Sequence, residues 1–251
     1  RGLGDVYKRQ DMYYMNPPAK DLSKIASSDK VKKVQKDFEA THVRPERLMK
    51  TLFTDEAYVK ANVDEARLMR RLFDLACNMQ SHDTDMQLYS LFTDEECYDL
   101  WSCNNLYWYL THACSPVTDG LMPYREADLL RNILDRADAA LKEGKNQATL
   151  RFGHESCLLP LVALLELNHY GESYPDVEKL SEQWRAYDIF PMASNVQFVF
   201  FHKKGSNDVL VKVLLNEKET KLPVKTDVAP YYHWKDVESY YREKLDKYQH
   251  I

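Results

Sequence analysis

The spacing of apolar residues changes at about residue 148, and this change decides which folds the chain can form. Before it, residues 17–145 carry apolar side chains at helical spacing. The clearest helical stripe consists of Leu68, Leu72, Leu75 and Ala76. After it, the β-rich runs Val196–His202 and Val209–Leu215 flank a turn segment with Gly205, which predicts a hairpin. We therefore expect a helical N-terminal half followed by an α/β layer.

Start and stop signals divide the helical half. Thr93 and Glu96 have the spacing of a capping box, and Thr54 is expected to be a second N-cap because acidic residues follow it. Gly144 is suited to end the last helix of this half. The stretch Ser115–Pro123 contains two prolines and a glycine, and we place a domain boundary there.

Three regions follow from these signals. Residues 1–16 are expected to be a non-native or disordered leader, because the first ten residues, RGLGDVYKRQ, lack an initial Met and any signal-peptide pattern. Residues 17–119 are expected to form a helical cap domain, and residues 120–251 the C-terminal part of an α/β core. Within that part we expect a short strand over Ala148–Phe152 and a closing helix over Trp234–Lys247.

Composition excludes several functional classes. The chain has 34 basic and 39 acidic residues, so its net charge of −5 gives no overall field that would favour nucleic acid. No apolar run approaches the ~20 residues of a membrane span. The 7 glycines form no P-loop or dinucleotide-binding pattern. The 5 cysteines are odd in number and contain no CxxC pair, so we expect no zinc site, and the disulfide pairing stays open.

The stretch Ala148–Leu167 carries the candidate chemistry. The expected strand delivers Gly153, His154 and Glu155 to its carboxyl end, where α/β proteins bind ligands. The next helix, with Pro160 in or near its first turn, offers N–H groups and a positive dipole end to a phosphate. His154 can donate hydrogen bonds to a phosphate oxygen, and Glu155 can donate a proton if burial or nearby anions keep it protonated. A helix cap without function is the competing interpretation.

Longer segments add to this motif. Arg151–Leu167 resembles the second signature of the histidine acid phosphatases (branch 2), in which a strand ends in Gly-His, followed by an acidic residue and a Leu/Pro-rich helix. The resemblance extends to segments similar to parts of the inositol polyphosphate phosphatase group of that family: Arg47–Val59, Pro191–Gln197, Val209–Glu217, Pro223 and Tyr231–Trp234. It therefore covers most of residues 17–251.

The resemblance implies a histidine-phosphatase-like α/β core, incomplete in this chain, with a helical cap or insertion domain. It implies hydrolysis of phytate-like inositol polyphosphates through a phosphohistidine, without a metal or other cofactor. His154 would contact the phosphate, Glu155 would protonate the leaving alcohol, and Arg151 is a further candidate for substrate binding. Glu155 directly follows the histidine, where many members have Asp and inositol polyphosphate phosphatases often have His-Ala-Glu. The parent protein is expected to be secreted or periplasmic.

One signature of the family is missing. None of the 8 histidines is preceded by Arg and followed by Gly, so the chain contains no Arg-His-Gly-x-Arg. The resemblance then implies that the nucleophile and the arginine clamp lie outside this chain, and that the chain alone has no turnover. Two alternatives stay open: a broad-specificity acid phosphatase, and a catalytically inactive α/β binding module in which Gly153–Glu155 is structural. The oligomeric state also stays open.

Other polar groups are weaker candidates. A structural ion pair competes with phosphate binding as the role of Arg151. His42–Arg44 and Lys50 are more typical of a solvated helix face than of a substrate contact. Ser81–Asp85 resembles a hydrolytic trio by composition only and is expected to be a polar loop, and Lys203–Gly205 is expected to be a hairpin turn.

Overall fold

The computed structural model describes residues 20–145 and 147–248 and shows two compact units. The helical unit comprises residues 29–107, and the mixed unit comprises the described residues up to 28 together with those from 108 onward. The expected leader, residues 1–16, lies outside the described residues. None of the helices in the described ranges is long and apolar enough to cross a membrane.

The helical unit is built from short amphipathic helices around one apolar cluster. Its helices are α2 (Asp29–His42), α3 (Glu46–Leu52), α4 (Glu56–Asn62), α5 (Glu65–Asn78), the short 3₁₀ helices η3 (Met79–Ser81) and η4 (Tyr89–Leu91), and most of α6 (Asp94–His112). The core cluster comprises Val43, Leu48, Met49, Val59, Met69, Ala76, Phe92 and Leu100. These residues come from several elements, so the unit is held together by side-chain packing between helices.

Capping explains where several of these helices begin. The capping box before α6 is confirmed: the Glu96 N–H donates to Thr93 Oγ1 at 3.2 Å, and the Thr93 N–H donates to Glu96 Oε2 at 2.9 Å. The expected cap at Thr54 is wrong by one residue. The N-cap of α4 is Asp55, whose carboxylate accepts the Tyr58 N–H at 2.9 Å. A carboxylate also interacts favourably with the helix dipole, which favours Asp55 over the neighbouring threonine.

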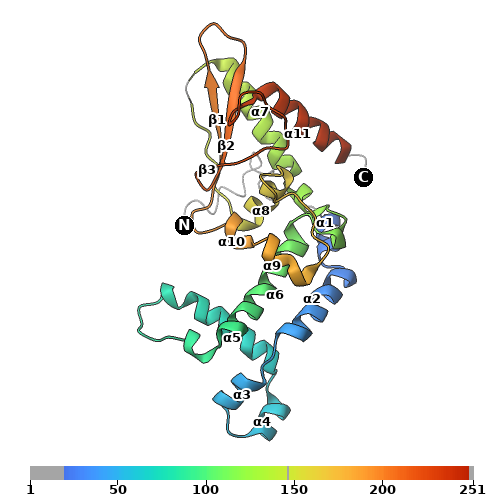
Figure 1. The fold of residues 1–251 in the computed structure, drawn as a ribbon, viewed down its shortest axis with the longest axis vertical. Helices are drawn as coiled ribbons and strands as arrows, with labels where there is room; N and C mark the ends of the chain where they lie inside the picture. The colour runs from blue at the N-terminus through green and yellow to red at the C-terminus, as the bar shows by residue number, and fades with distance from the viewer. Residues whose placement is uncertain (1–19, 146, 249–251) are drawn as a thin grey trace. The chain divides into compact units, whose positions relative to one another are not determined.

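The mixed unit combines helices with a small antiparallel sheet. Its helices are α1 (Lys20–Ala26), the 3₁₀ helices η5 (Pro116–Thr118), η6 (Met122–Glu126) and η7 (Val177–Lys179), α7 (Ala127–Glu143), α8 (Glu155–Leu164), α9 (Leu180–Gln183), α10 (Ala186–Ile189) and α11 (Trp234–Tyr248). Its strands are β1 (Val196–His202), β2 (Val209–Leu215), β3 (Lys218–Glu219) and β4 (Tyr232–His233), in the order β1-β2-β3 with β4 also paired to β2. Figure 1 shows α7 and α11 running alongside this sheet.

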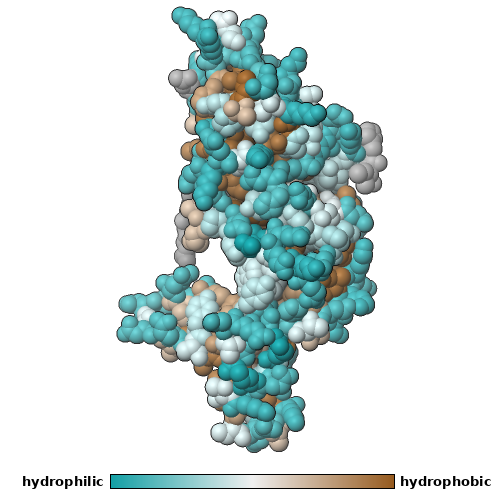
Figure 2. Space-filling model, viewed as in Figure 1, coloured by the Kyte–Doolittle hydropathy of each residue, from teal (hydrophilic) through white to brown (hydrophobic). Residues whose placement is uncertain are grey.

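The predicted hairpin is confirmed with its expected ends. β1 and β2 pair antiparallel in a register that runs from Val196 opposite Leu215 to His202 opposite Val209. One face of β2 is buried, and the Phe200 ring on β1 meets the Trp234 ring of α11 at a centroid distance of 4.9 Å. Figure 2 shows further apolar surface over β1 and β2. The sheet therefore has a packed face, while much of β1 remains only half-buried.

The expected strand over Ala148–Phe152 is wrong. Residues 147–154 are irregular, and the Leu150 and Phe152 side chains are 75% and 69% exposed. A strand exists only where a neighbouring strand supplies hydrogen-bond partners, and no other described strand pairs with this segment. Residues 148–152 thus have the apolar alternation of a strand, but no described strand pairs with them.

The boundaries of the two compact units differ from those of the expected cap domain. The helical unit comprises residues 29–107, whereas the expected domain was 17–119. Helix α6 starts in the helical unit, and its last turn belongs to the mixed unit, so the unit boundary falls inside a helix. Turn residues such as those of Ser115–Pro123 reveal where a helix has ended, whereas a compact unit follows from which side chains pack together. The assignment of residues 17–119 and 120–251 to family domains stays a prediction.

Candidate active site

The Gly153-His154-Glu155 motif lies at the start of α8. His154 is the N-cap residue, with φ −120° and ψ 166°, and its carbonyl accepts the N–H groups of Cys157 and Leu158, each at 3.0 Å. All three residues of the motif are exposed. The extended backbone of His154 lets the chain enter the helix directly, so the motif is presented at the helix end as predicted.

The body of α8 anchors this motif. Leu159, Leu161, Val162 and Leu164 are buried, and η6 packs against the helix. Pro160 lies inside α8 rather than in its first turn; this ring removes one N–H group of the helix interior. The N–H groups of a first turn have no intrahelical acceptor and lie at the positive end of the dipole. Because the body of the helix is buried and its N-terminus is exposed, these N–H groups are held in place and accessible to an anion.

Glu155 and Arg151 flank His154 and differ in exposure. The Glu155 side chain is exposed in this structure. Arg151 is half-buried, and its Nη2 donates to Asn132 Oδ1 of α7 at 2.7 Å. That contact ties the irregular segment to α7 and leaves the role of Arg151 toward a substrate a prediction.

A buried acidic residue lies on the inner side of the same helix. Glu126, the last residue of η6, is 3% exposed, and its Oε2 has no hydrogen-bond partner among the described residues. Burial raises its pKa to about 8, although Arg125 acts in the opposite direction. Glu126 in turn contributes, after burial, to the raised pKa of the Cys157 thiol in the first turn of α8. The burial of Glu126 therefore favours the neutral form of its carboxyl group.

A buried histidine lies beside Arg125, the residue that precedes this acid. His112 is 6% exposed, and burial followed by the charge of Arg125 lowers its pKa to about 4. Its Nδ1 lies 2.7 Å from Thr111 Oγ1, and its Nε2 lies 3.5 Å from Arg125 Nη1. The imidazole is thus neutral at physiological pH. Sequence reasoning missed both His112 and Glu126, because no local pattern reports that a polar residue will be buried.

A second histidine cluster lies at the sheet. His233 Nδ1 is 3.0 Å from Asp208 and its Nε2 is 2.9 Å from Asp227 Oδ1. These two carboxylates raise the pKa of His233, and His233 lowers the pKa of Asp227. The cluster connects the hairpin, β4 and the loop before β4. It was also missed, since the three residues are separated along the chain.

The weaker candidates have structural partners. Arg44 pairs with Glu95 at 3.0 Å and with Asp99 at 2.6 Å. Gly205 has φ +80° in the hairpin turn, a left-handed conformation that glycine adopts easily. The stretch 81–85 is exposed and lies between helices, as expected for a polar loop. These observations favour the structural interpretation of Arg44, of residues 81–85 and of the turn at Lys203–Gly205.

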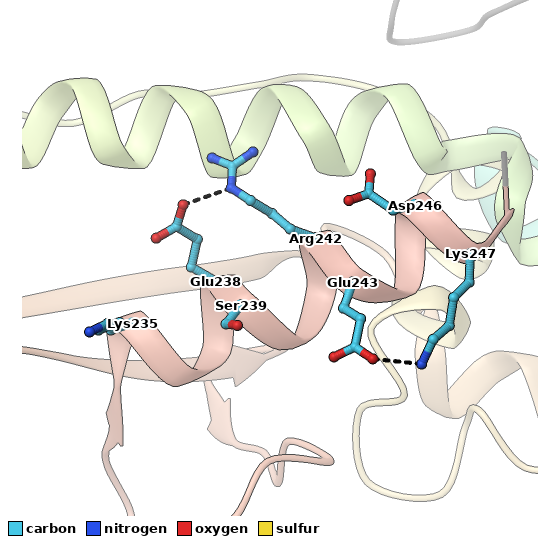
Figure 3. Close-up of a pocket in the computed structure, with 7 residues that line it drawn as sticks. All are labelled: Lys235, Glu238, Ser239, Arg242, Glu243, Asp246 and Lys247. Carbon is cyan, nitrogen blue, oxygen red and sulfur yellow. Dashed lines mark hydrogen bonds and ion pairs between the residues drawn. The ribbon is translucent and has the colours of Figure 1, made fainter.

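The hollow in Figure 3 follows one face of α11 and is lined by Lys235, Glu238, Ser239, Arg242, Glu243, Asp246 and Lys247. Within it Arg242 pairs with Glu238 at 2.6 Å and Lys247 with Glu243 at 2.7 Å. Its charges neutralise one another along a single helix. Residues 20–145 and 147–248 contain no group of three or more His, Cys, Asp or Glu side chains that could hold a metal ion.

Comparison with known proteins gives concordant results. Human multiple inositol polyphosphate phosphatase 1 (Homo sapiens) is 28% identical over 134 residues, which are 48% of this chain and 27% of the human protein. Multiple inositol polyphosphate phosphatase of Bifidobacterium longum, solved with phosphate, matches with a TM-score of 0.61 and 18% identity over 97% of this chain and 57% of that chain. The same enzyme solved with inositol hexasulfate matches with a TM-score of 0.56 and 19% identity, over 94% and 56%.

These matches confirm the expected histidine-phosphatase-like fold, with a small antiparallel sheet among many helices. The chain spans about a quarter of the length of the human relative and somewhat more than half of the bifidobacterial one. The model of the family described as "Histidine phosphatase superfamily (branch 2)" matches residues 10–216. Since that match covers most of the sequence, the chain belongs to the histidine phosphatase superfamily, branch 2.

Proposed function

We propose that this chain is part of a phosphomonoesterase that hydrolyses phytate-like inositol polyphosphates. A histidine outside these 251 residues attacks the phosphorus, and the bond from phosphorus to the leaving oxygen breaks. His154 and the N-terminus of α8 hold the phosphate oxygens, and Glu155 gives its proton to the leaving alcohol. Water then cleaves the phosphohistidine and releases phosphate. Arg151 is proposed to contribute to substrate binding.

The observation that carries this proposal is the exposed Gly153-His154-Glu155 motif at the N-terminus of the buried helix α8. In a member of a histidine phosphatase superfamily, this arrangement supplies a phosphate-binding helix end, a histidine and an acid within three consecutive residues. A phosphate bound there would place its negative charge beside Glu155, which favours the protonated carboxyl that a general acid requires.

Open strand edges support the proposal that the rest of the core lies outside this chain. Among the described strands β1 pairs only with β2, although both faces of β1 carry apolar residues. A strand that is apolar on both faces is typical of the interior of an α/β sheet. Leu150 and Phe152 are exposed on a segment that has the sequence of a strand. The absence of Arg-His-Gly from the sequence agrees with a nucleophile on another segment.

A broad-specificity acid phosphatase is the second candidate. Glu155 directly follows His154, whereas inositol polyphosphate phosphatases often have His-Ala-Glu. This difference places the acid one residue nearer to the histidine in the sequence than in His-Ala-Glu. Initial rates on inositol hexakisphosphate and on a simple alkyl phosphate separate the two candidates, because a phytase prefers the first and a general acid phosphatase shows no such preference.

The decisive experiment uses the whole protein, with an upstream segment that carries Arg-His-Gly-x-Arg. His154→Ala is expected to lower kcat/KM by about a hundredfold or more, the size expected when a preorganised phosphate contact is lost. His169→Ala is the matched control, because His169 is an exposed histidine on the loop after α8. Full activity of His154→Ala would exclude the proposed phosphate contact of this histidine. If the parent reading frame lacks Arg-His-Gly-x-Arg, the chain is a binding module instead.

The 251-residue chain alone gives a second, independent test. It is expected to show no phosphatase turnover, since it has no nucleophile in the family's sequence context. Turnover that disappears in His154→Ala would contradict the proposed division of the active site. The same resemblance supports secretion or periplasmic export of the whole protein, which fractionation of cells producing it would test.

A further inference from the structure

Two of the five cysteines lie at the same junction in the helical unit. Cys77 is in the last turn of α5, and Cys97 is in the first turn of α6. Residues 78–96 connect them and include η3 and η4. Both thiols are half-buried and free. They belong to no part of the candidate active site, which lies in the mixed unit.

Aromatic packing brings this junction together. The Phe73 ring of α5 meets the Tyr89 ring edge-on at 6.4 Å and the Phe92 ring at 5.9 Å. Phe73 and Cys77 are four residues apart on one helix and therefore share a face. Cys97 packs against the core cluster that contains Phe92. The packing thus places both thiols beside the same aromatic group.

Tyr89 links the two thiols directly. Its pKa is raised to about 12, first by a hydrogen bond with Cys77, then by burial and by the nearby Cys77 and Cys97. The pKa of Cys97 is raised by burial, then by Asp94 and Cys77. Burial and nearby negative charge therefore disfavour a thiolate at Cys97, and we assign to Cys97 the second step of the exchange.

We propose that Cys77 and Cys97 are a redox pair that closes to an intramolecular disulfide joining the end of α5 to the start of α6. The oxidant is a low-molecular-weight disulfide such as oxidised glutathione. The Cys77 thiolate attacks one sulfur, forms a mixed disulfide and releases one glutathione. The Cys97 thiolate then displaces the second glutathione. Two protein thiols lose two electrons and two protons, and the reagent becomes two reduced glutathione molecules.

The other cysteines provide internal comparisons. Burial raises the pKa of the Cys103 thiol to about 12 and that of the Cys114 thiol to about 11. Both are therefore slow nucleophiles at pH 8. Closing the Cys77–Cys97 bond would also constrain residues 78–96 in the unfolded chain, which shifts the denaturation midpoint upward. That shift would be reversed by dithiothreitol.

The experiment treats the folded chain with oxidised glutathione at pH 8, blocks remaining thiols and maps the peptides by mass spectrometry. The expected product is a peptide pair joined through Cys77 and Cys97, obtained before any other disulfide. Cys97→Ser is expected to stop at a glutathione attached to Cys77. Cys103→Ser, the matched control on the same helix as Cys97, is expected to form the internal bond normally.

Tyr89→Phe separates the role of the hydroxyl from that of packing. It keeps the ring and removes the donor to Cys77, so the mixed disulfide is expected to form more slowly while the final bond is the same. The mapping of the unmodified chain needs no variant to fold. Separate glutathiones on both cysteines, or a bond from Cys77 to any other cysteine, would overturn the proposal.

Discussion

Two acidic residues near the first turn of α8 differ in exposure, and therefore in what can change their pKa. On the outer side the Glu155 side chain is exposed. On the inner side Glu126 is buried below the same turn, and burial alone raises its pKa to about 8. Exposure thus separates the proposed site residue Glu155 from the buried acid Glu126, and the difference shows that burial can perturb the pKa of an acid outside the proposed motif.

The largest expected effect tests the outer side. In the whole enzyme Glu155→Gln is expected to lower the rate on an alkyl phosphate by about 10²–10⁴-fold, the range for loss of a general acid. p-Nitrophenyl phosphate should lose far less, because its leaving group departs without a proton. Stopped-flow measurement of phosphoenzyme formation with both substrates distinguishes these results. Equal losses on the two substrates would exclude a proton-donor role for Glu155.

The next effect tests the inner side. The pKa of Glu126 is higher in the folded chain than in the unfolded chain, so its contribution to stability is complete below about pH 4.5 and is lost as pH rises to about 8. Glu126→Gln should therefore stabilise the chain at pH 9 by roughly 2–5 kcal/mol and change little at pH 5. Urea unfolding at both pH values measures this difference. The exposed Glu143→Gln is the control, and an equal response from the two variants would refute the role of burial.

A third prediction compares buried and exposed apolar residues near this turn. Leu159→Ala removes a fully buried side chain of α8 and is expected to cost about 2–5 kcal/mol. Phe152→Ala is expected to change the stability of this chain by less than about 0.5 kcal/mol, because Phe152 is 69% exposed. In the whole protein Phe152→Ala should cost several times more if a further strand covers it. A neutral result there would weaken the proposal of an incomplete core.

The smallest effect concerns two histidines with opposite environments. Burial lowers the pKa of His112 to about 4, so NMR titration should show this ring neutral at pH 6.5. The carboxylates of Asp208 and Asp227 raise the pKa of His233, so this ring should still be charged at pH 6.5. Its stabilising contribution is complete below pH 6.5 and is lost as pH rises through the folded-state pKa. The double variant Asp208→Asn/Asp227→Asn should return His233 to ordinary titration.

The local elements of the fold could be predicted with good success. The Thr93–Glu96 capping box, the stop at Gly144 and the hairpin of β1 and β2 all depend on residues within a few positions of one another. The position of His154 and Glu155 at a helix start was predictable for the same reason. The unit boundaries were not, because α6 continues past the end of the helical unit without a turn signal.

By itself, the sequence determined the family resemblance, the main helices, the hairpin and the place of Gly153-His154-Glu155 at the start of α8. Only the tertiary structure decided that residues 148–152 pair with no described strand and that Cys77 and Cys97 share Tyr89 as a neighbour. It also decided that Glu126 is buried and that its Oε2 has no hydrogen-bond partner among the described residues. The hydrogen bonds of caps and turns are made by residues close in the sequence, so these elements can be predicted from short segments. Strand pairing, burial and thiol contacts depend on distant segments meeting in space.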